Sequence, residues 1–320
     1  MSKYTLTKMH ITPDDYLAKY EEYDDADFSY VKYFIEPYGP HEINEMSDTH
    51  YKAGDEVPYH EHACGYETFL IDGGSVEITI RGKRTIAQKG DMVHIPPYTA
   101  HKFRFLEHNT IWRELFQEIQ MNSGMMEHLR VKEYHRDRIT EPDYIAENHR
   151  RHQSIWYEIQ PEPEDVGRYD IPELRPFDFG LATFSYDRAL LRQKVRRAET
   201  AGVKEVWQAV LGTGVRLSWT ADNPYPNLFV VYSGKVRVQV DGEAEFIANE
   251  RDILYIPNYL AGSIETTEDT ILLDYNCQGY LFRALEELKA RRAHAPAALS
   301  DEEIKAVLKK YDCHIWMEAL

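Results

Sequence analysis

The chain is poor in cysteine and has no long apolar run. Its three cysteines, Cys64, Cys277 and Cys313, are widely separated and make no CxxC pair. That pattern argues against a disulfide framework or a thiolate zinc site and fits a reducing cytoplasm. The longest apolar runs fall well short of the roughly 20 residues needed to cross a bilayer, and the first residues lack the apolar stretch of a signal peptide. We therefore expect a cytoplasmic protein with no membrane partner.

Positive charge is also scarce. The 37 lysines and arginines are outnumbered by 54 aspartates and glutamates, which gives a formal net charge of −17. Such a surface repels nucleic acid and anionic membranes unless a basic face is segregated. The short basic clusters at 149–152, 192–197 and 291–292 are mixed with acidic or apolar residues, as is typical of solvated helix faces. We therefore expect no nucleic-acid partner.

Length and composition favour two folded domains. The 320 residues are 43% hydrophobic and 12% aromatic, enough for two cores. We predict an N-terminal extension at 1–34, a first β domain at 35–120, a helical or irregular linker at 121–165, a second β domain at 166–278 and a helical segment at 279–320. Thr12 and Pro13 resemble a helix start, and Ser300 with Glu303 resembles a capping box.

Short alternating runs separated by glycine and proline turns mark both β domains. Examples are SVEITI at 75–80 and HKFRF at 101–105 in the first, and NLFVVYSG at 227–234 in the second. Strands of this length at regular spacing favour a sandwich or barrel. The domains also align as a diverged repeat, with Gly74 on Gly234 and GDMVHIP at 90–96 on RDILYIP at 251–257. We therefore predict a mainly β chain built from two copies of one barrel.

Three histidines and a glutamate in the first copy have the spacing of a metal site. His60 and His62 are two residues apart, so on a strand both imidazoles point to one face. Glu67 opens the next apolar run, and His101 comes from a distant strand after a proline turn. Such donors suit a divalent transition ion and leave positions open for substrate, water or dioxygen. The alternative, unconnected surface or core histidines, does not account for the spacing of the whole set.

The spacing resembles the signature of the cupin superfamily. The first cupin motif, G(x)5HxH(x)3-4E(x)6G, is matched by Gly54, His60, His62, Glu67 and Gly74. The second, G(x)5PxG(x)2H(x)3N, is matched by Gly90, Pro96 and His101, with Tyr98 and Phe105 in place of the usual glycine and asparagine. The resemblance implies a jelly-roll barrel in which His60, His62, Glu67 and His101 bind one divalent metal per chain. Fe(II) is the first expectation, with Mn, Zn, Ni or Cu as alternatives.

The second copy lacks these ligands. The repeat offset carries them onto Thr220, Asp222, Asn227 and Gly262, none of which is a histidine. The chain thus resembles a bicupin with a single, N-terminal metal site. We expect its second barrel to serve packing, pocket closure or assembly into a homo-oligomer.

Several neighbours of the ligands are further candidates. Tyr66 and Tyr98 flank ligands and could donate a proton, and Glu67 could act as a ligand or as a general base. We interpret Cys64 as a small buried filler and His94 as a packing residue. Strand parity places apolar side chains below the metal, which predicts a pocket for a small, aromatic, oxygen-bearing substrate. The residues assigned to that pocket are Phe69, Ile78, Phe103, Phe105 and Trp112.

Three functions remain open. The leading hypothesis is a cupin dioxygenase, in which Fe(II) binds substrate and dioxygen side by side. The glutamate-containing ligand set resembles quercetin or acireductone dioxygenases more than the gentisate group. The second hypothesis is a non-oxidative lyase, decarboxylase or isomerase using Mn, Zn or Ni, although oxalate decarboxylases carry two complete sites. The third is a non-catalytic ligand-binding cupin.

Overall fold

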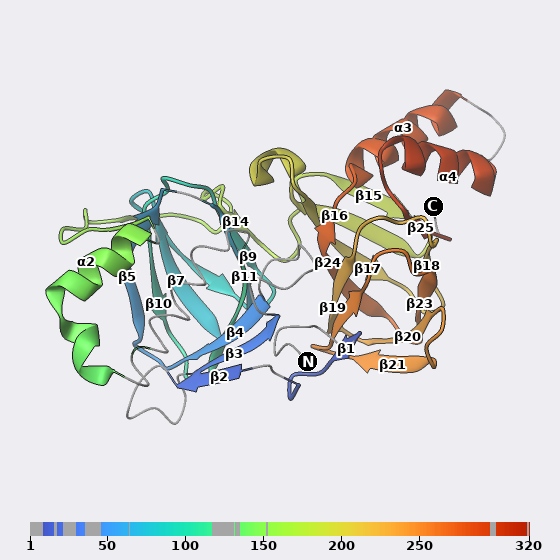
Figure 1. Ribbon diagram of the computed structural model, residues 1–320. Helices are drawn as coiled ribbons and strands as arrows, with labels where there is room; N and C mark the ends of the chain where they lie inside the picture. Colours follow the sequence, from blue (N-terminus) through green and yellow to red (C-terminus); the bar gives the residue numbers. More distant parts are fainter. Residues whose placement is uncertain are drawn as a thin grey trace. The chain divides into compact units, whose positions relative to one another are not determined.

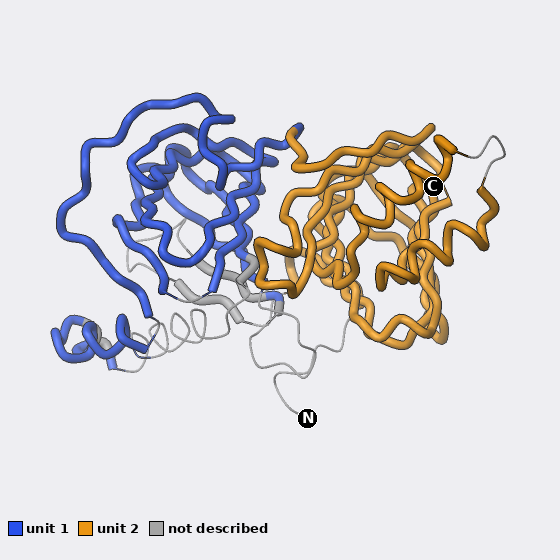
Figure 2. The backbone as a smooth tube through the Cα atoms, turned by 90° about the horizontal axis from the view of Figure 1, so that it is seen from above, with its two compact units in different colours: residues 1–5, 16–178 blue, residues 6–15, 179–320 orange. Residues whose placement is uncertain are grey.

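The computed structural model describes residues 9–15, 18–21, 30–35, 46–63, 65–116, 131, 135–151, 153–294, 299–318 and 320. The chain divides into two compact units (Figure 2). The first holds residues 1–5 and 16–178, and the second holds residues 6–15 and 179–320. Each unit is a barrel of two facing β-sheets, which confirms the predicted mainly β, two-barrel fold (Figure 1).

The first unit has the strand order of a jelly roll. In the described residues, one sheet runs β12-β5-β10-β7-β8-β13 and the other β14-β9-β6-β11-β4-β3-β2. The strands of the barrel itself are β2 Ala18–Glu21, β3 Tyr30–Ile35, β4 Met46–Tyr51, β5 Glu56–His62, β6 Glu67–Gly73, β7 Ser75–Ile80, β8 Lys83–Gln88, β9 Met92–Ile95, β10 His101–Phe105 and β11 Thr110–Phe116.

Period-two alternation builds the core between these sheets. In β10, His101, Phe103 and Phe105 are buried, whereas Arg104 is exposed and Lys102 half-buried. The buried members join inward-facing residues of both sheets in one apolar cluster. Burying each large apolar side chain contributes about 1.5–3 kcal/mol. The sequence pattern therefore fixes which face of each strand meets the core.

The segment between the two barrels, residues 135–178, pairs with strands of the first unit. It contains the 3-10 helix η1 Arg136–Thr140, the helix α2 Pro142–Arg151 and the short strands β12 Ser154–Trp156, β13 Glu164–Asp165 and β14 Leu174–Arg175. Strand β12 pairs with β5, β13 with β8 and β14 with β9. Because of these pairings the division between the units falls after residue 178, whereas the sequence suggested a boundary at 165.

The second unit repeats the arrangement of the first. Its sheets run β1-β22-β19-β24-β17-β16-β15 and β21-β20-β23-β18-β25. The order β22-β19-β24-β17 corresponds to β9-β6-β11-β4, which confirms the duplication. The strands are β1 His10–Ile11, β15 Thr183–Tyr186, β16 Ala189–Val195, β17 Glu205–Leu211, β18 Arg216–Trp219, β19 Asn227–Ser233, β20 Lys235–Val240, β21 Phe246–Asn249, β22 Ile253–Ile256, β23 Gly262–Thr266, β24 Thr270–Cys277 and β25 Ile315–Met317; the 3-10 helix η2 Arg197–Thr200 lies between β16 and β17.

The same glycine turn occurs in both copies. Gly74 and Gly234 both have positive φ, +75° and +85°. A Cβ on Gly74 would collide with Thr110, and one on Gly234 would collide with Asp269 and Thr270. The close approach of a neighbouring strand therefore requires glycine at both positions. This is the physical basis of the alignment between the two repeats.

Two helices follow the second barrel. Helix α3 spans Leu281–His294 and helix α4 spans Asp301–Lys310. The predicted capping box is confirmed, because Ser300 Oγ accepts from the Glu303 amide and the Glu303 side chain accepts from the Ser300 amide. Among the helices that the structure describes, none combines the length and apolar character needed to span a bilayer.

The expected helix near Thr12 is wrong. The Asp15 carboxylate accepts hydrogen bonds from the Thr12 amide at 3.1 Å and hydroxyl at 2.9 Å, which closes a turn. The preceding β1 pairs with β22, so His10 lies opposite Leu254 in the second barrel. Long-range strand pairing overrides the local capping signal here. Part of the predicted extension at 1–34 therefore belongs to a domain far along the sequence.

The basic cluster at 192–197 also differs from the expectation. It lies mostly on strand β16 rather than on a solvated helix, and Lys194 is buried with Nζ 2.7 Å from the Phe179 carbonyl oxygen. Clusters 149–151 and 291–292 lie on the helices α2 and α3, as expected. A buried lysine that donates to a backbone carbonyl supports the fold and presents no basic surface.

Candidate metal centre

The four predicted ligands come from three strands of the first barrel, of which β5 and β10 are paired in one sheet and β6 lies in the other. His60 and His62 lie on β5, Glu67 opens β6, and His101 opens β10. His101 is the Cα partner of His60, and the pairing of β10 with β5 shifts register between Val57 and His60. This irregularity turns the two histidines of β5 toward the interior, where they face His101. The barrel thus gathers residues up to 41 positions apart.

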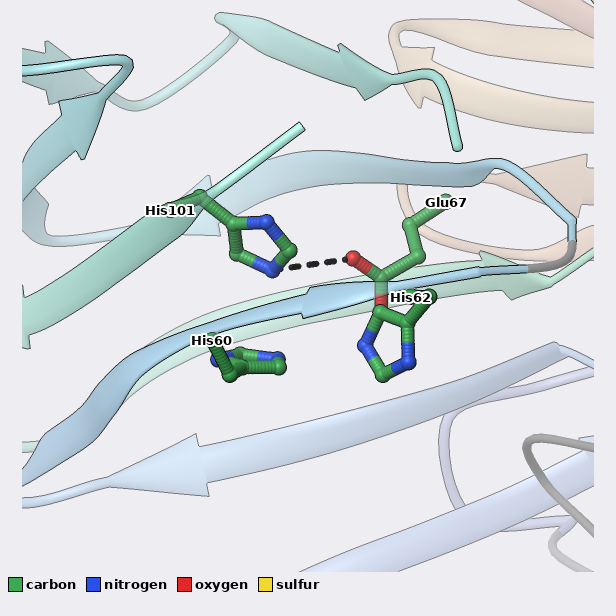
Figure 3. Close-up of side chains that lie close together, drawn as sticks. All are labelled: His60, His62, Glu67 and His101. Carbon is green, nitrogen blue, oxygen red and sulfur yellow. Dashed lines mark ion pairs between the residues drawn. The ribbon is translucent and has the colours of Figure 1, made fainter. Parts of the chain in front are cut away.

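The ligand atoms of the four side chains lie within 4.8 Å of one another. His62 Nε2 is 3.3 Å from Glu67 Oε1, and His101 Nε2 is 3.2 Å from Glu67 Oε2 (Figure 3). His101 is fully buried, and Glu67 and His60 are only 5% and 4% exposed. The distances match donors converging on one point.

Backbone carbonyls fix the tautomers of two imidazoles. His60 Nδ1 lies 2.7 Å from the Pro58 carbonyl oxygen, and His101 Nδ1 lies 2.7 Å from that of Thr99. A carbonyl only accepts, so each Nδ1 carries a proton, and in the neutral imidazole Nε2 then has the lone pair that a metal needs. Such outer hydrogen bonds hold a metal-ligating imidazole in the orientation that coordination needs.

Electrostatics keep two of the donors, His60 and Glu67, in their metal-binding forms. Burial and the neighbouring His101 lower the pKa of His60 to about 3, so this imidazole is neutral at neutral pH. Burial alone would raise the pKa of Glu67, but His62 and His101 lower it well below its usual value. Burial alone would lower the pKa of His62, but the charge of Glu67 and its hydrogen bond with His62 together have the larger effect, so the pKa of this imidazole is raised. Metal ligands must be deprotonated, and Glu67 and His60 already are.

The residues fit a divalent transition ion. His62 Nε2, Glu67 Oε2 and His101 Nε2 are buried and, in the part of the chain that the structure describes, have no hydrogen-bond partner beyond the contacts within this group of ligands. Buried polar atoms of this kind are costly without a partner. Three imidazole nitrogens and one carboxylate oxygen suit Fe(II), Mn(II), Ni(II), Cu(II) or Zn(II). The same group is the only cluster of metal-ligand type found within the described residues.

A tryptophan from the linker completes the surroundings of the site. Strand β12 pairs with β5 so that Trp156 lies opposite His60. The indole stacks on the His60 ring with centroids 4.3 Å apart and planes 12° apart, and it remains 39% exposed. His149 of α2 stacks near the same indole, at 5.4 Å. Sequence reasoning missed Trp156, because a three-residue strand in a polar linker shows no alternation that would reveal it.

The residues predicted to line a substrate pocket form a packed aromatic floor. The Phe69 and Trp112 ring centroids are 4.3 Å apart, and those of Phe103 and Trp112 are 4.7 Å apart. Phe103 lies 5.2 Å from the His101 ring. All five assigned residues, including Ile78 and Phe105, are at most 4% exposed. Phe103 joins this floor to the metal ligands through its contact with His101, and contact of the five residues with a substrate stays a prediction.

The other candidates have different surroundings. Tyr66 is buried, and its ring centroid is 5.7 Å from that of His94. His94 Nδ1 lies 2.9 Å from the Thr68 hydroxyl on the adjacent strand. Tyr98 is 67% exposed and has φ of +57°, which explains why cupins usually have glycine there. Cys64 lies outside the described residues.

A buried arginine follows Trp112 on β11. Arg113 is fully buried, and its guanidinium donates to both carboxylate oxygens of Asp48, at 2.7 and 2.9 Å. The bidentate pair makes Arg113 a structural residue.

In the second barrel an indole fills the metal position. Trp219 is the Cα partner of Gly262, just as His60 is the partner of His101. The true counterpart of His60 is therefore Trp219 rather than Thr220, because β18 lacks the register shift of β5. Any Cβ on Gly262 would lie 2.8 Å from Cζ2 of Trp219. Loss of the histidine side chain at this position thus makes room for the indole.

The mouth of the second barrel is also filled. A cavity of about 20 Å³, enough for a single water, is lined by Asn227, the counterpart of Glu67, and by the C-terminal residues Cys313 and His314. Cys277 lines it as well, and both cysteines are buried free thiols. The structure thus brings together two thiols that the sequence separates.

Comparison with known proteins agrees with this geometry. Residues 47–110 match the family model described as a cupin domain. A 57-residue segment is 37% identical to quercetin 2,3-dioxygenase of Bacillus subtilis, which corresponds to 18% of this chain and 17% of that relative. The chain therefore spans a small fraction of the curated relative that it matches.

Solved structures extend the likeness to both barrels. A variant of oxalate decarboxylase from Bacillus subtilis superposes with a TM-score of 0.53 at 15% identity, covering 97% of this chain and 88% of that one. A second structure of that enzyme, in a study of its Mn(II) centres, gives a TM-score of 0.53 at 15% identity, covering 97% and 89%. At this identity the likeness shows the fold alone. Residues 47–110 therefore form a cupin domain, and the chain has the two-barrel fold of these solved structures. Both findings support the resemblance to a bicupin.

Proposed function

We propose that this bicupin is a metal-dependent dioxygenase, with Fe(II) as its metal, that acts on a small oxygen-bearing substrate. The observation that carries the proposal is the buried set of His60, His62, Glu67 and His101, with Nε2 and carboxylate atoms directed at one point. Four protein ligands leave about two positions of a six-coordinate ion for exogenous ligands. The sequence likeness to a quercetin dioxygenase supports an oxidative reaction over a non-oxidative one.

Each residue has a distinct task in this proposal. His60 and His101 hold the ion through Nε2, and their Nδ1 atoms are fixed by carbonyl oxygens. Glu67 contributes the negative charge, and we assign it as a metal ligand rather than as a general base. The bound ion supplies a redox-active Lewis acid. Phe103 and Trp112 exclude water below the ligands, which strengthens electrostatic interactions there.

A non-oxidative reaction is the second candidate, because the fold matches oxalate decarboxylase over both barrels. In that case Mn, Zn or Ni would polarise a carboxylate or carbonyl group without dioxygen. The single site weakens the comparison, since the second barrel has Trp219 and Gly262 where the first has His60 and His101. Ligand binding without catalysis is the third candidate.

Oxygen uptake separates these functions. The protein is purified anaerobically, its metal is quantified, and Fe(II), Mn(II) and Zn(II) forms are assayed with catechols, hydroxybenzoates, β-diketones, enediols and oxalate. We expect uptake by the Fe(II) form that is lost in His101→Ala. Turnover by the Mn or Zn form without oxygen consumption would replace the dioxygenase with the non-oxidative enzyme.

Further variants test the remaining assignments. Glu67→Gln should weaken metal retention if Glu67 is a ligand, whereas a pure base would leave retention intact and reduce turnover. Tyr66→Phe and Tyr98→Phe test the proposed proton donors. We also propose that the protein is a cytoplasmic homo-oligomer, which light scattering of the purified protein and fractionation of its cells can test.

A further inference from the structure

A second carboxylate faces the interior of the metal-binding barrel. Glu114 lies on β11 and is 4% exposed. Its Cα partner on β6 is Phe69, a member of the aromatic floor, and the next inward residue on its own strand is Trp112. Directly opposite residues of an antiparallel pair project to the same face. The Glu114 side chain therefore points between the sheets, toward the sheet that carries the three histidines.

The register places this carboxylate next to the metal ligands. Glu67 is the Cα partner of Phe116, and Glu114 precedes Phe116 by two residues on the same strand. Glu114 and Glu67 are thus diagonal neighbours on one face, about 7–8 Å apart by the usual geometry of sheets, with Cβ atoms somewhat closer. A ligand of an ion at Glu67 would have to extend over that distance to reach Glu114.

Two hydroxyl groups mark Glu114 as an acceptor. Thr49 Oγ1 donates to Glu114 Oε1 at 3.0 Å, and Ser47 Oγ lies 3.5 Å from Oε2. Both residues are buried on β4, opposite β11. A carboxylate offers about four lone-pair sites and accepts several hydrogen bonds at once. The three side chains form a polar patch in an interior that is otherwise aromatic and aliphatic.

We propose that Glu114 determines specificity at the metal site by accepting a hydrogen bond from a hydroxyl group of the substrate. The inference rests on the proposed function, because it assumes an ion at Glu67. Together with Glu67, Glu114 puts a second carboxylate on the face of the sheet that contributes to the metal site. Such a site favours hydroxyl-bearing substrates such as catechols and enediols, and it disfavours small dicarboxylates such as oxalate.

The second barrel supplies a matched control. Asp274 pairs with Phe229 on β19 as Glu114 pairs with Phe69 on β6, so it is the counterpart of Glu114 in the barrel without the metal ligands. Asp274→Asn therefore makes the same change from carboxylate to amide away from the site. Glu114→Asp retains the charge and shortens the side chain.

The test measures binding, so it does not depend on turnover. Catechol and oxalate are titrated into the Co(II)-loaded protein and followed by the visible absorption of the ion. Wild type should bind catechol in preference to oxalate. Because hydrogen bonds to charged groups are strong, Glu114→Gln should reduce the ratio of catechol affinity to oxalate affinity by about 10- to 100-fold. Asp274→Asn should leave this ratio unchanged. Glu114→Asp should give a ratio between those of wild type and Glu114→Gln.

Each outcome bears on the proposal. A preference that is the same in wild type and Glu114→Gln, with metal content and the unfolding transition unchanged, would overturn it. Wild type that prefers oxalate, or that binds neither probe, would also overturn it. If Glu114→Gln does not fold, the comparison rests on Thr49→Val. This variant removes the hydrogen bond that orients the Glu114 carboxylate, and the misplaced carboxylate should shift the same ratio in the same direction. If the Fe(II) form of the wild type takes up no oxygen with any substrate, the proposed dioxygenase activity is refuted, but the expected ratio of catechol to oxalate binding is unaffected.

Discussion

Replacing His101 by alanine should remove most of the stabilisation that a bound metal gives to the first unit. His101 is the most completely buried ligand, and its Nδ1 is fixed 2.7 Å from the Thr99 carbonyl oxygen. Its Nε2 is therefore held in place before a metal arrives, so little entropy is lost when the ion binds. Alanine removes one of four donors and leaves Glu67 with His62 as its remaining imidazole contact.

The expected stabilisation follows from mass action. An ion that binds only the folded state stabilises it by about 4 kcal/mol at a concentration 1,000 times its Kd. For a unit of this size each kcal/mol shifts Tm by about 2–4 °C, so the shift on metal addition should be about 8–16 °C. The variant should lose most of that shift. Its metal-free Tm will also fall, because a buried side chain is removed.

Differential scanning calorimetry with and without Zn(II) measures both effects. The transition of the first unit should move with metal, and that of the second unit should not, because Trp219 occupies the corresponding position there. His294→Ala, at an exposed position on α3, is the matched control and should keep the full shift. If His101→Ala keeps the full metal-induced shift, His101 is not a ligand and the site must be reassigned.

Three further predictions concern the second barrel. Gly262→Ala should cost about 1–3 kcal/mol in a denaturant titration, since the new Cβ would lie 2.6 Å from a backbone oxygen and 2.8 Å from Trp219; a neutral effect would contradict the tight packing there. Burial raises the pKa of Asp274 to about 7, so the folded state binds more protons than the unfolded chain between about pH 4 and 7 and stability should fall as pH rises through that window. Asp274→Asn should flatten the dependence of stability on pH between about pH 4 and 7. If the slope in this range is unchanged, groups other than Asp274 cause the pH dependence. The hydrogen bond with Cys313 and burial raise the pKa of Cys277 well above its usual value, so iodoacetamide at pH 8 should label Cys277 only after unfolding, as mass spectrometry of the native and unfolded protein can show.

Much of the site could be predicted from local sequence. The spacing of His60 and His62 fixes a common face on any strand, and the turn before His101 fixes where its strand begins. Strand parity also predicted the aromatic floor, because inward positions alternate regardless of what lies opposite. Both barrels could be predicted for the same reason, since the turn glycines Gly74 and Gly234 report a local requirement for positive φ.

Only the tertiary structure decided which segments meet. It moved β1 into the second barrel, since a two-residue strand takes its place from the edge it pairs with and carries no periodicity of its own. It brought Trp156 against His60. It also showed that the counterpart of His60 in the second barrel is Trp219 and not Thr220, the residue that the repeat offset predicts. It also turned Glu114 toward the ligands. The sequence by itself determined the metal ligands and the duplicated barrel, because both depend on short-range spacing. The surroundings of the site depend on registers between distant strands, which are settled by packing across the whole barrel.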